Sequence, residues 1–129
     1  MLATFSTIAD SPSVCARPRV RLQKDKNHNS QRIATVLMFL SEVEEGGETV
    51  FPDPSAKWAN TRLEALAANS SACAHRGPSV RPHAGDAILF WSTTVMGEED
   101  PASLHASCPV TRGEKWTATK WMHSTPFKV

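Results

Sequence analysis

Two side chains in the C-terminal part of the chain have the types and the spacing to serve one reaction. His105 and Lys115 lie ten positions apart in the run LHASCPVTRGEKWTATKW (104–121). A neutral imidazole is a common metal ligand, and the compact ammonium of a lysine holds carboxylates through charge-assisted hydrogen bonds. The two side chains could serve a metal site and a carboxylate pocket, but the spacing by itself proves nothing; a core histidine and a solvated lysine are the ordinary alternatives.

The elements that must position these two side chains are β-strands. We expect LHASCPV (104–110) to form one strand, an Arg-Gly pair to turn the chain, and KWTATKWMH (115–123) to form the last strand. Side chains alternate between the two faces of a strand, so Lys115 and Trp121 share a face. A lysine and a tryptophan on one face are compatible with the lining of a pocket.

The upstream half carries further short apolar runs of strand length. IATVLMFL (33–40) is predicted to be a buried strand, with a helix as the rival interpretation. EEGG (44–47) is predicted to end this run in a turn that leads to a second strand at 48–51. AILFW (87–91) is predicted to be another buried strand. Many short strands joined by Gly/Pro turns in one small domain indicate a sandwich or a barrel.

Two segments lack a strand pattern. Residues 1–27 are predicted to be an unpatterned basic leader in coil, and an organelle transit peptide is the sharper alternative for it. MLATFSTIAD (1–10) has neither a basic start nor a sustained apolar run, so no secretory signal is predicted. The connection 53–79 is expected to be loop with one short helix at about 61–68, where TRLE has the form of a capping box.

The composition is that of one ordinary globular domain. The chain has 129 residues, and hydrophobic and charged residues make up 40% and 21% of it. A formal net charge of +1 gives no reason to expect nucleic acid as a partner. The three cysteines, Cys15, Cys73 and Cys108, are too few for a disulfide scaffold or a zinc site. One disulfide and buried free thiols both stay open.

Three runs, taken together and in this order, carry a resemblance to a known family. RIATVLMFLSEVEEGGETVFP (32–52), RPHAGDAILFW (81–91) and the run at 104–121 resemble the C-terminal catalytic domain of prolyl 4-hydroxylases, which are Fe(II)- and 2-oxoglutarate-dependent dioxygenases. The resemblance covers about residues 28–126, and we assign 28–129 to this domain. It implies a double-stranded β-helix (jelly roll) and an oxidoreductase.

The resemblance also implies an activity and its requirements. The reaction would be the O2-dependent 4-hydroxylation of peptidyl proline at a non-haem Fe(II) site, with 2-oxoglutarate as cosubstrate and ascorbate as a further cofactor. Proline-rich or collagen-like polypeptides would be the substrates, and the endoplasmic reticulum the compartment. Related enzymes are expected to carry cysteines at the positions of Cys73 and Cys108, which favours a pairing without deciding it.

Four residues match functional positions of the family. By this resemblance His105 is the distal iron ligand and Lys115 binds the 5-carboxylate of 2-oxoglutarate. Thr49, in GGETV, matches a threonine that assists at the cosubstrate, and Trp121 matches an aromatic wall near the pocket. Thr49 and Trp121 would serve equally well as ordinary strand residues in a core.

The chain departs from the family at the other two iron ligands. The family has a tyrosine-containing strand that ends in a His-x-Asp pair, but this chain contains no His-x-Asp and no tyrosine. Asp25 and His28 are the nearest carboxylate and imidazole, in reversed order and at a different spacing. We therefore expect a jelly roll that is incomplete on its N-terminal side, with unpaired sheet edges, and a chain that is inactive alone. The alternatives are a catalytically dead peptide-binding module and a non-functional fragment.

Overall fold

The computed structural model describes residues 4–7, 31–53 and 70–124, and all structural statements below refer to these residues. Nine strands and two short 3-10 helices follow one another along the chain. The strands are β1 (Thr4–Thr7), β2 (Arg32–Phe39), β3 (Val43–Gly46), β4 (Thr49–Val50), β5 (Ser79–Val80), β6 (Ala87–Trp91), β7 (Ala106–Ser107), β8 (Val110–Gly113) and β9 (Trp116–His123). The 3-10 helices are η3 (Ala74–Arg76) and η4 (Pro101–Ser103). The prediction of a mainly β chain is confirmed.

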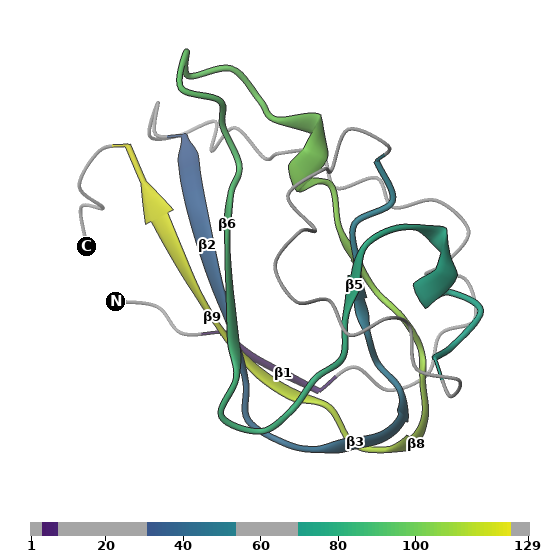
Figure 1. Cartoon of the computed structure of the whole chain (residues 1–129). Helices are drawn as coiled ribbons and strands as arrows, with labels where there is room; N and C mark the ends of the chain where they lie inside the picture. The colour runs from purple at the N-terminus through teal and green to yellow at the C-terminus, as the bar shows by residue number, and fades with distance from the viewer. Residues whose placement is uncertain (1–3, 8–30, 54–69, 125–129) are drawn as a thin grey trace.

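The strands form three antiparallel sheets. The largest has the order β1-β9-β2-β6, a second has the order β5-β4-β7, and β3 pairs with β8. Figure 1 shows β2, β6 and β9 on one side of the molecule, β5 on the other, and the β3–β8 pair at the end where the chain crosses between them. Strands from distant parts of the sequence, such as β2 and β9, are therefore neighbours in the sheets.

Aromatic side chains fill the space between the two larger sheets. Phe51, which follows β4, and Phe90, on β6, meet edge to face with ring centroids 5.3 Å apart. They form one cluster with Ala102, against which Ile88 packs. Phe51 is completely buried. This contact joins the β5-β4-β7 sheet to the β1-β9-β2-β6 sheet. It also forms part of the wall around His105.

The strand predicted at 87–91 is confirmed as β6, but it is not a buried strand. Phe90 is buried, whereas the side chains of Leu89 and Trp91 are 56% and 60% exposed. The physical reason is the position of β6 at the edge of its described sheet, with only one of its faces turned toward the small sheet. Alternation then leaves Leu89 and Trp91 on the outer face.

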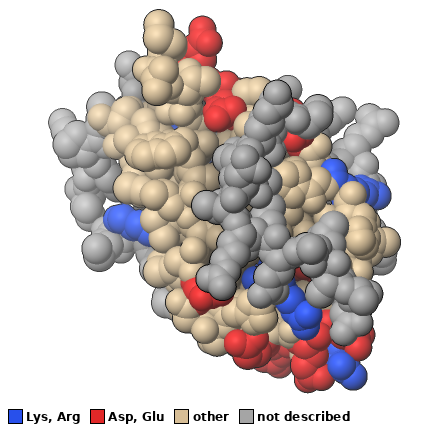
Figure 2. Space-filling model, in the orientation of Figure 1, with Lys and Arg blue, Asp and Glu red and all other residues tan. Residues whose placement is uncertain are grey.

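The turn predicted at 44–47 begins too early. Residues 43–46 form β3, which is held to β8 by ion pairs from Arg112 to Glu44 and Glu45 at 2.9 and 3.0 Å. The chain turns instead at Gly46 and Gly47, which have φ angles of +76° and +71°. Exposed glutamates do not look like a strand from their sequence, and here a cross-strand arginine compensates their charge. Figure 2 shows acidic side chains gathered at this end of the molecule.

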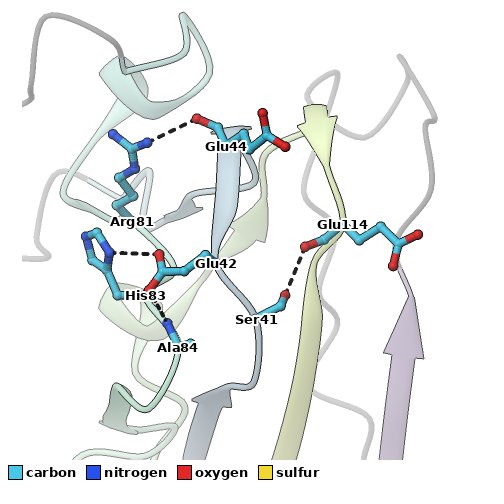
Figure 3. A network of polar contacts seen from close by, with 7 residues as sticks. All are labelled: Ser41, Glu42, Glu44, Arg81, His83, Ala84 and Glu114. Atoms are coloured by element: carbon cyan, nitrogen blue, oxygen red, sulfur yellow. Dashed lines mark hydrogen bonds and ion pairs between the residues drawn. The ribbon is translucent and has the colours of Figure 1, made fainter.

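Polar contacts close the same end of the fold (Figure 3). The Glu42 carboxylate accepts a hydrogen bond from the backbone N–H of Ala84 at 3.0 Å and lies 3.2 Å from Nδ1 of His83. The Ser41 hydroxyl donates to the carbonyl of Glu114 at 2.9 Å. The loop after β2 is thereby attached to the turn before β6 and to the turn before β9.

The N-terminal prediction is wrong in part. Residues 4–7 lie in the segment predicted as coil, yet they form β1 and pair with β9. The edge of β9 that does not pair with β2 therefore has a partner, because backbone hydrogen bonding needs no hydrophobic pattern in the strand that joins. The helix predicted at 61–68 lies outside the described residues; in the described part of that connection the helical element is η3. None of the helices in the described ranges is long and apolar enough to cross a bilayer.

Candidate functional site

Lys115 occupies a polar cradle in the interior. Its side chain is 3% exposed, and its ammonium donates to the carbonyl of Gly47 at 2.6 Å and to the Ser107 hydroxyl at 3.0 Å. The Thr49 hydroxyl lies 3.4 Å from the same nitrogen. The alternative of a solvated surface lysine is excluded. The ammonium, which comes from the segment before β9, thus meets oxygens from the segment before β4, from β4 itself and from β7.

The electrostatic environment of Lys115 leaves its charge largely uncompensated. Burial lowers the pKa of Lys115 to about 8, while the negative charge of Glu48 acts in the opposite direction. Its hydrogen-bond partners are neutral oxygens, and no carboxylate within the described ranges forms an ion pair with it. A buried cation surrounded by neutral acceptors is a favourable partner for an incoming carboxylate.

His105 lies just before β7 and its ring is held in a defined orientation. Nδ1 lies 2.8 Å from the carbonyl of Ser103, so Nδ1 carries the proton and Nε2 keeps its lone pair. The ring packs against Phe90 and Phe51, at centroid distances of 4.6 and 5.7 Å. Burial lowers the pKa of His105, and the positive charge of Arg32 acts in the same direction. A neutral imidazole whose Nδ1–H is engaged by a carbonyl is the form that ligates metals.

A cavity of about 300 Å³ opens beside His105. Arg32 and Ser92 line it from the large sheet, and residues 99–101 and 103–105 line it from the loop and η4. The guanidinium carbon of Arg32 lies 4.2 Å from the ring centroid of Trp121, a cation–π arrangement. Nε of Arg32 is buried without a hydrogen-bond partner among the residues that the structure describes.

Ser107 connects the two predicted residues. It follows His105 by two positions, so along an extended segment its side chain lies on the same side as that of His105. Its hydroxyl accepts the hydrogen bond from Lys115. Lys115 thus contacts the residue two positions after His105, and the assignment of His105 and Lys115 to one site stays a prediction.

The other two predicted residues differ in their placement. Thr49 lies in the cradle of Lys115, whereas Trp121 lies six residues along the chain from Lys115, about 20 Å at strand spacing, and meets Arg32 instead. The role of Trp121 at the cosubstrate stays a prediction. Sequence reasoning missed Ser107 and Arg32; the spacing of two from His105 would have indicated Ser107, but nothing local singled out Arg32.

The described residues are better suited to bind 2-oxoglutarate than to bind iron. The cradle of Lys115 supplies a cation and hydroxyls for a terminal carboxylate such as that of 2-oxoglutarate. For iron, the described ranges supply His105 alone and contain no group of three His, Cys, Asp or Glu side chains that could hold a metal. Asp25 and His28 lie outside these ranges. We therefore derive no reaction step through iron.

Cys73 and Cys108 form a disulfide, with their Cα atoms 5.7 Å apart. The alternative of free thiols at these positions is thereby excluded. Both cysteines are buried in a cluster with Val50, against which Ala106 packs. The bridge attaches the segment that begins η3 to the end of β7 and so holds the strand that follows His105.

Comparison with known proteins gives the same assignment as the residues. Residues 15–123 match the family described as the 2OG-Fe(II) oxygenase superfamily, so the match begins within the predicted leader. Probable prolyl 4-hydroxylase 3 of Arabidopsis thaliana is 49% identical over 107 residues, which is 79% of this chain and 34% of that protein. Prolyl 4-hydroxylase 5 of the same plant is 48% identical over 102 residues, with the same coverage. The chain spans about a third of the length of these curated relatives.

A solved structure supports the fold. The viral collagen prolyl hydroxylase of Paramecium Bursaria Chlorella virus-1 superposes with a TM-score of 0.56 at 24% identity, over 95% of this chain and 50% of the viral chain. This likeness confirms the predicted jelly-roll architecture. On the family match, the chain belongs to the 2OG-Fe(II) oxygenase superfamily; the plant relatives that it resembles are named as prolyl 4-hydroxylases.

Proposed function

We propose that the chain is the 2-oxoglutarate-binding part of a prolyl 4-hydroxylase catalytic domain. The reaction is the O2-dependent 4-hydroxylation of peptidyl proline with Fe(II) and 2-oxoglutarate. The observation that carries this proposal is the buried ammonium of Lys115, which contacts the neutral oxygens of Gly47, before β4, and of Ser107, on the strand that follows His105. The substrates are proline-rich or collagen-like polypeptides, ascorbate is a further cofactor, and the compartment is the endoplasmic reticulum.

Each residue of the site has a role in this proposal. The ammonium of Lys115 holds the 5-carboxylate of 2-oxoglutarate, and the Thr49 hydroxyl, 3.4 Å from it, is a second contact. Nε2 of His105, whose ring is fixed by Ser103, is one iron ligand. Phe51 and Phe90 pack against the ring of His105. Arg32, which packs over the ring of Trp121, lines the adjoining cavity.

The donor set limits what the chain does by itself. A non-haem iron site of this class needs two imidazoles and a carboxylate, and the sequence has no His-x-Asp pair. We therefore propose that the chain binds 2-oxoglutarate but does not turn it over alone. A peptide-binding module is the second candidate, which the cavity lined by Arg32 and His105 favours.

Calorimetric titration with 2-oxoglutarate tests the central proposal. Lys115→Met should weaken binding by about tenfold or more, because a charge-assisted hydrogen bond in a buried site contributes about 1.5–3 kcal/mol. Lys120→Met, a lysine on the same strand with the opposite parity, should bind as the unaltered chain does. Equal affinity of the Lys115→Met variant would refute the assigned role.

A turnover assay separates the enzyme from the binding module. The chain is incubated with Fe(II), ascorbate, 2-oxoglutarate and a proline-rich peptide, and succinate is measured. We expect no succinate above background. Prompt release that His105→Ala abolishes would contradict the proposed inactivity and establish the enzyme, whereas peptide binding without succinate supports the module.

A further inference from the structure

Glu48 is a buried carboxylate that has no role in the proposed binding of 2-oxoglutarate by Lys115 and Thr49. Its side chain is 4% exposed. One carboxylate oxygen accepts from the backbone N–H of Ser71 at 2.9 Å, and the other accepts from the Ser71 hydroxyl at 2.7 Å. The backbone carbonyl of Glu48 accepts from the N–H of Cys108 at 2.7 Å. Glu48 thus connects the start of β4 to two other segments of the site.

The position of Glu48 in the chain links it to the cradle. Its two sequence neighbours are Gly47, whose carbonyl binds the ammonium of Lys115, and Thr49, whose hydroxyl lies beside the same ammonium. Fixing the residue between them therefore fixes two of the three cradle oxygens. The third, the Ser107 hydroxyl, belongs to the residue before Cys108, which Glu48 holds by its carbonyl.

Glu48 is also the carboxylate whose negative charge acts to raise the pKa of Lys115. The other carboxylates near the ends of these strands have partners of their own: Glu44 and Glu45 pair with Arg112, and Glu114 accepts from the indole N–H of Trp116. The remaining close group is the ring of Phe39, whose centroid lies 5.6 Å from the ammonium. Of the charged groups in the described ranges, Glu48 is the one that favours the protonated form of Lys115.

We propose that Glu48 is a positioning residue for the carboxylate-binding cradle: it anchors the oxygens around Lys115 through Ser71 and Cys108, and its negative charge keeps the buried ammonium protonated before a ligand arrives. The identity of that ligand rests on the proposed function. The effect on Lys115 does not, since it is a property of the ligand-free chain.

The direct test is the titration of Lys115 in the ligand-free chain, followed by the ¹³Cε signal of labelled lysines and assigned with Lys115→Met. In Glu48→Gln, which keeps the size of the side chain and an acceptor for Ser71, the Lys115 signal should titrate at lower pH than in the unaltered chain. Glu98→Gln, in the exposed loop after β6, should leave the titration unchanged. An unchanged titration in Glu48→Gln overturns the proposal, because removal of the negative charge beside Lys115 must then have no effect on its protonation.

A measurement on the unaltered chain covers the case in which Glu48→Gln does not fold. The Lys115 signal should also move over the pH range in which the Cδ signal of Glu48 titrates, and a constant Lys115 signal there overturns the proposal. Calorimetry with 2-oxoglutarate adds the functional consequence: Glu48→Gln should lose more affinity at pH 8 than at pH 6.5. If the unaltered chain binds no 2-oxoglutarate while the Lys115 signal shifts as expected, the proposed function fails and the role of Glu48 stands.

Discussion

The ammonium of Lys115 lies 3.0 Å from the hydroxyl of Ser107, so the lysine contacts the strand that follows His105 although ten positions separate the two in the chain. Between them the chain leaves the interior, pairs as β8 with β3, turns at Gly113 and returns as β9. The return places Lys115 against the strand that follows His105. The ten positions from His105 to Lys115 are therefore the length of chain that forms β8 and returns to the interior.

Binding of 2-oxoglutarate and stability should depend on alkaline pH in opposite directions. The pKa of Lys115 is lowered from 10.5 to about 8 by burial. Affinity should be constant below pH 8 and fall up to tenfold per pH unit above it, as the ammonium deprotonates. The free energy of unfolding should rise between pH 8 and 10.5, because there the unfolded chain binds more protons than the folded one.

The measurement for stability is urea denaturation across this pH range in the unaltered chain and in Lys115→Met. The difference between their pH dependences isolates Lys115 from the other lysines and should amount to an order of 3 kcal/mol over the window. Parallel pH profiles of the two chains would show that Lys115 is not desolvated in the folded state.

His105→Ala should destabilise the chain even without metal. The ring contacts Phe51 and Phe90 and its Nδ1–H donates to Ser103, so its removal should cost about 1–3 kcal/mol in urea denaturation. Because the pKa of His105 is lowered, the neutral folded form loses stability as pH falls below 6.5, and this loss should be smaller in the variant.

His83→Ala is the matched control for His105. The side chain of His83 is exposed and pairs with Glu42, also exposed, so its removal should change the free energy of unfolding by less than about 0.5 kcal/mol. Equal losses in the two variants would mean that His105 is not packed between the two phenylalanines as described.

Reduction of the disulfide should destabilise the chain strongly. Cys73 and Cys108 are separated by 35 residues, and a loop of this length corresponds to about 3–4 kcal/mol of chain-entropy stabilisation. Thermal or urea denaturation with and without dithiothreitol measures the effect. Cys73→Ser should already show the loss, and the reductant should then have no further effect on the transition; a second decrease would indicate that another thiol pairs.

Two glycines with similar backbone angles should respond differently to alanine. Gly46 and Gly97 have φ angles of +76° and +80°. A Cβ on Gly46 would overlap the carbonyl oxygen of Pro109, whereas a Cβ on Gly97 would meet nothing within 4 Å. Gly97→Ala should cost about 1 kcal/mol, from the backbone angle alone. Gly46→Ala should cost at least about twice as much in urea denaturation, and equal costs would contradict the close approach of Gly46 to Pro109.

Residue types and local periodicity determined the main strands, and the resemblance of the motifs indicated two candidate site residues. The runs at 33–40 and 115–123 contain many β-branched and aromatic residues, so the local sequence was enough to predict them as strands. His105 and Lys115 could be identified because their motif carries its own context. Residues 4–7 and 43–46 could not, because β1 has no strand pattern of its own and β3 is stabilised by Arg112 from a distant strand.

Only the tertiary structure decided which polar groups surround Lys115. Gly47, Thr49 and Ser107 meet at one nitrogen because β4 pairs with β7 in a register that places Thr49 opposite Ser107. Register is a property of two strands and of the sheet that they join, and neither strand encodes it alone. The pairing of Cys73 with Cys108 was left open for the same reason, since it depends on a Cα distance that only the folded chain sets.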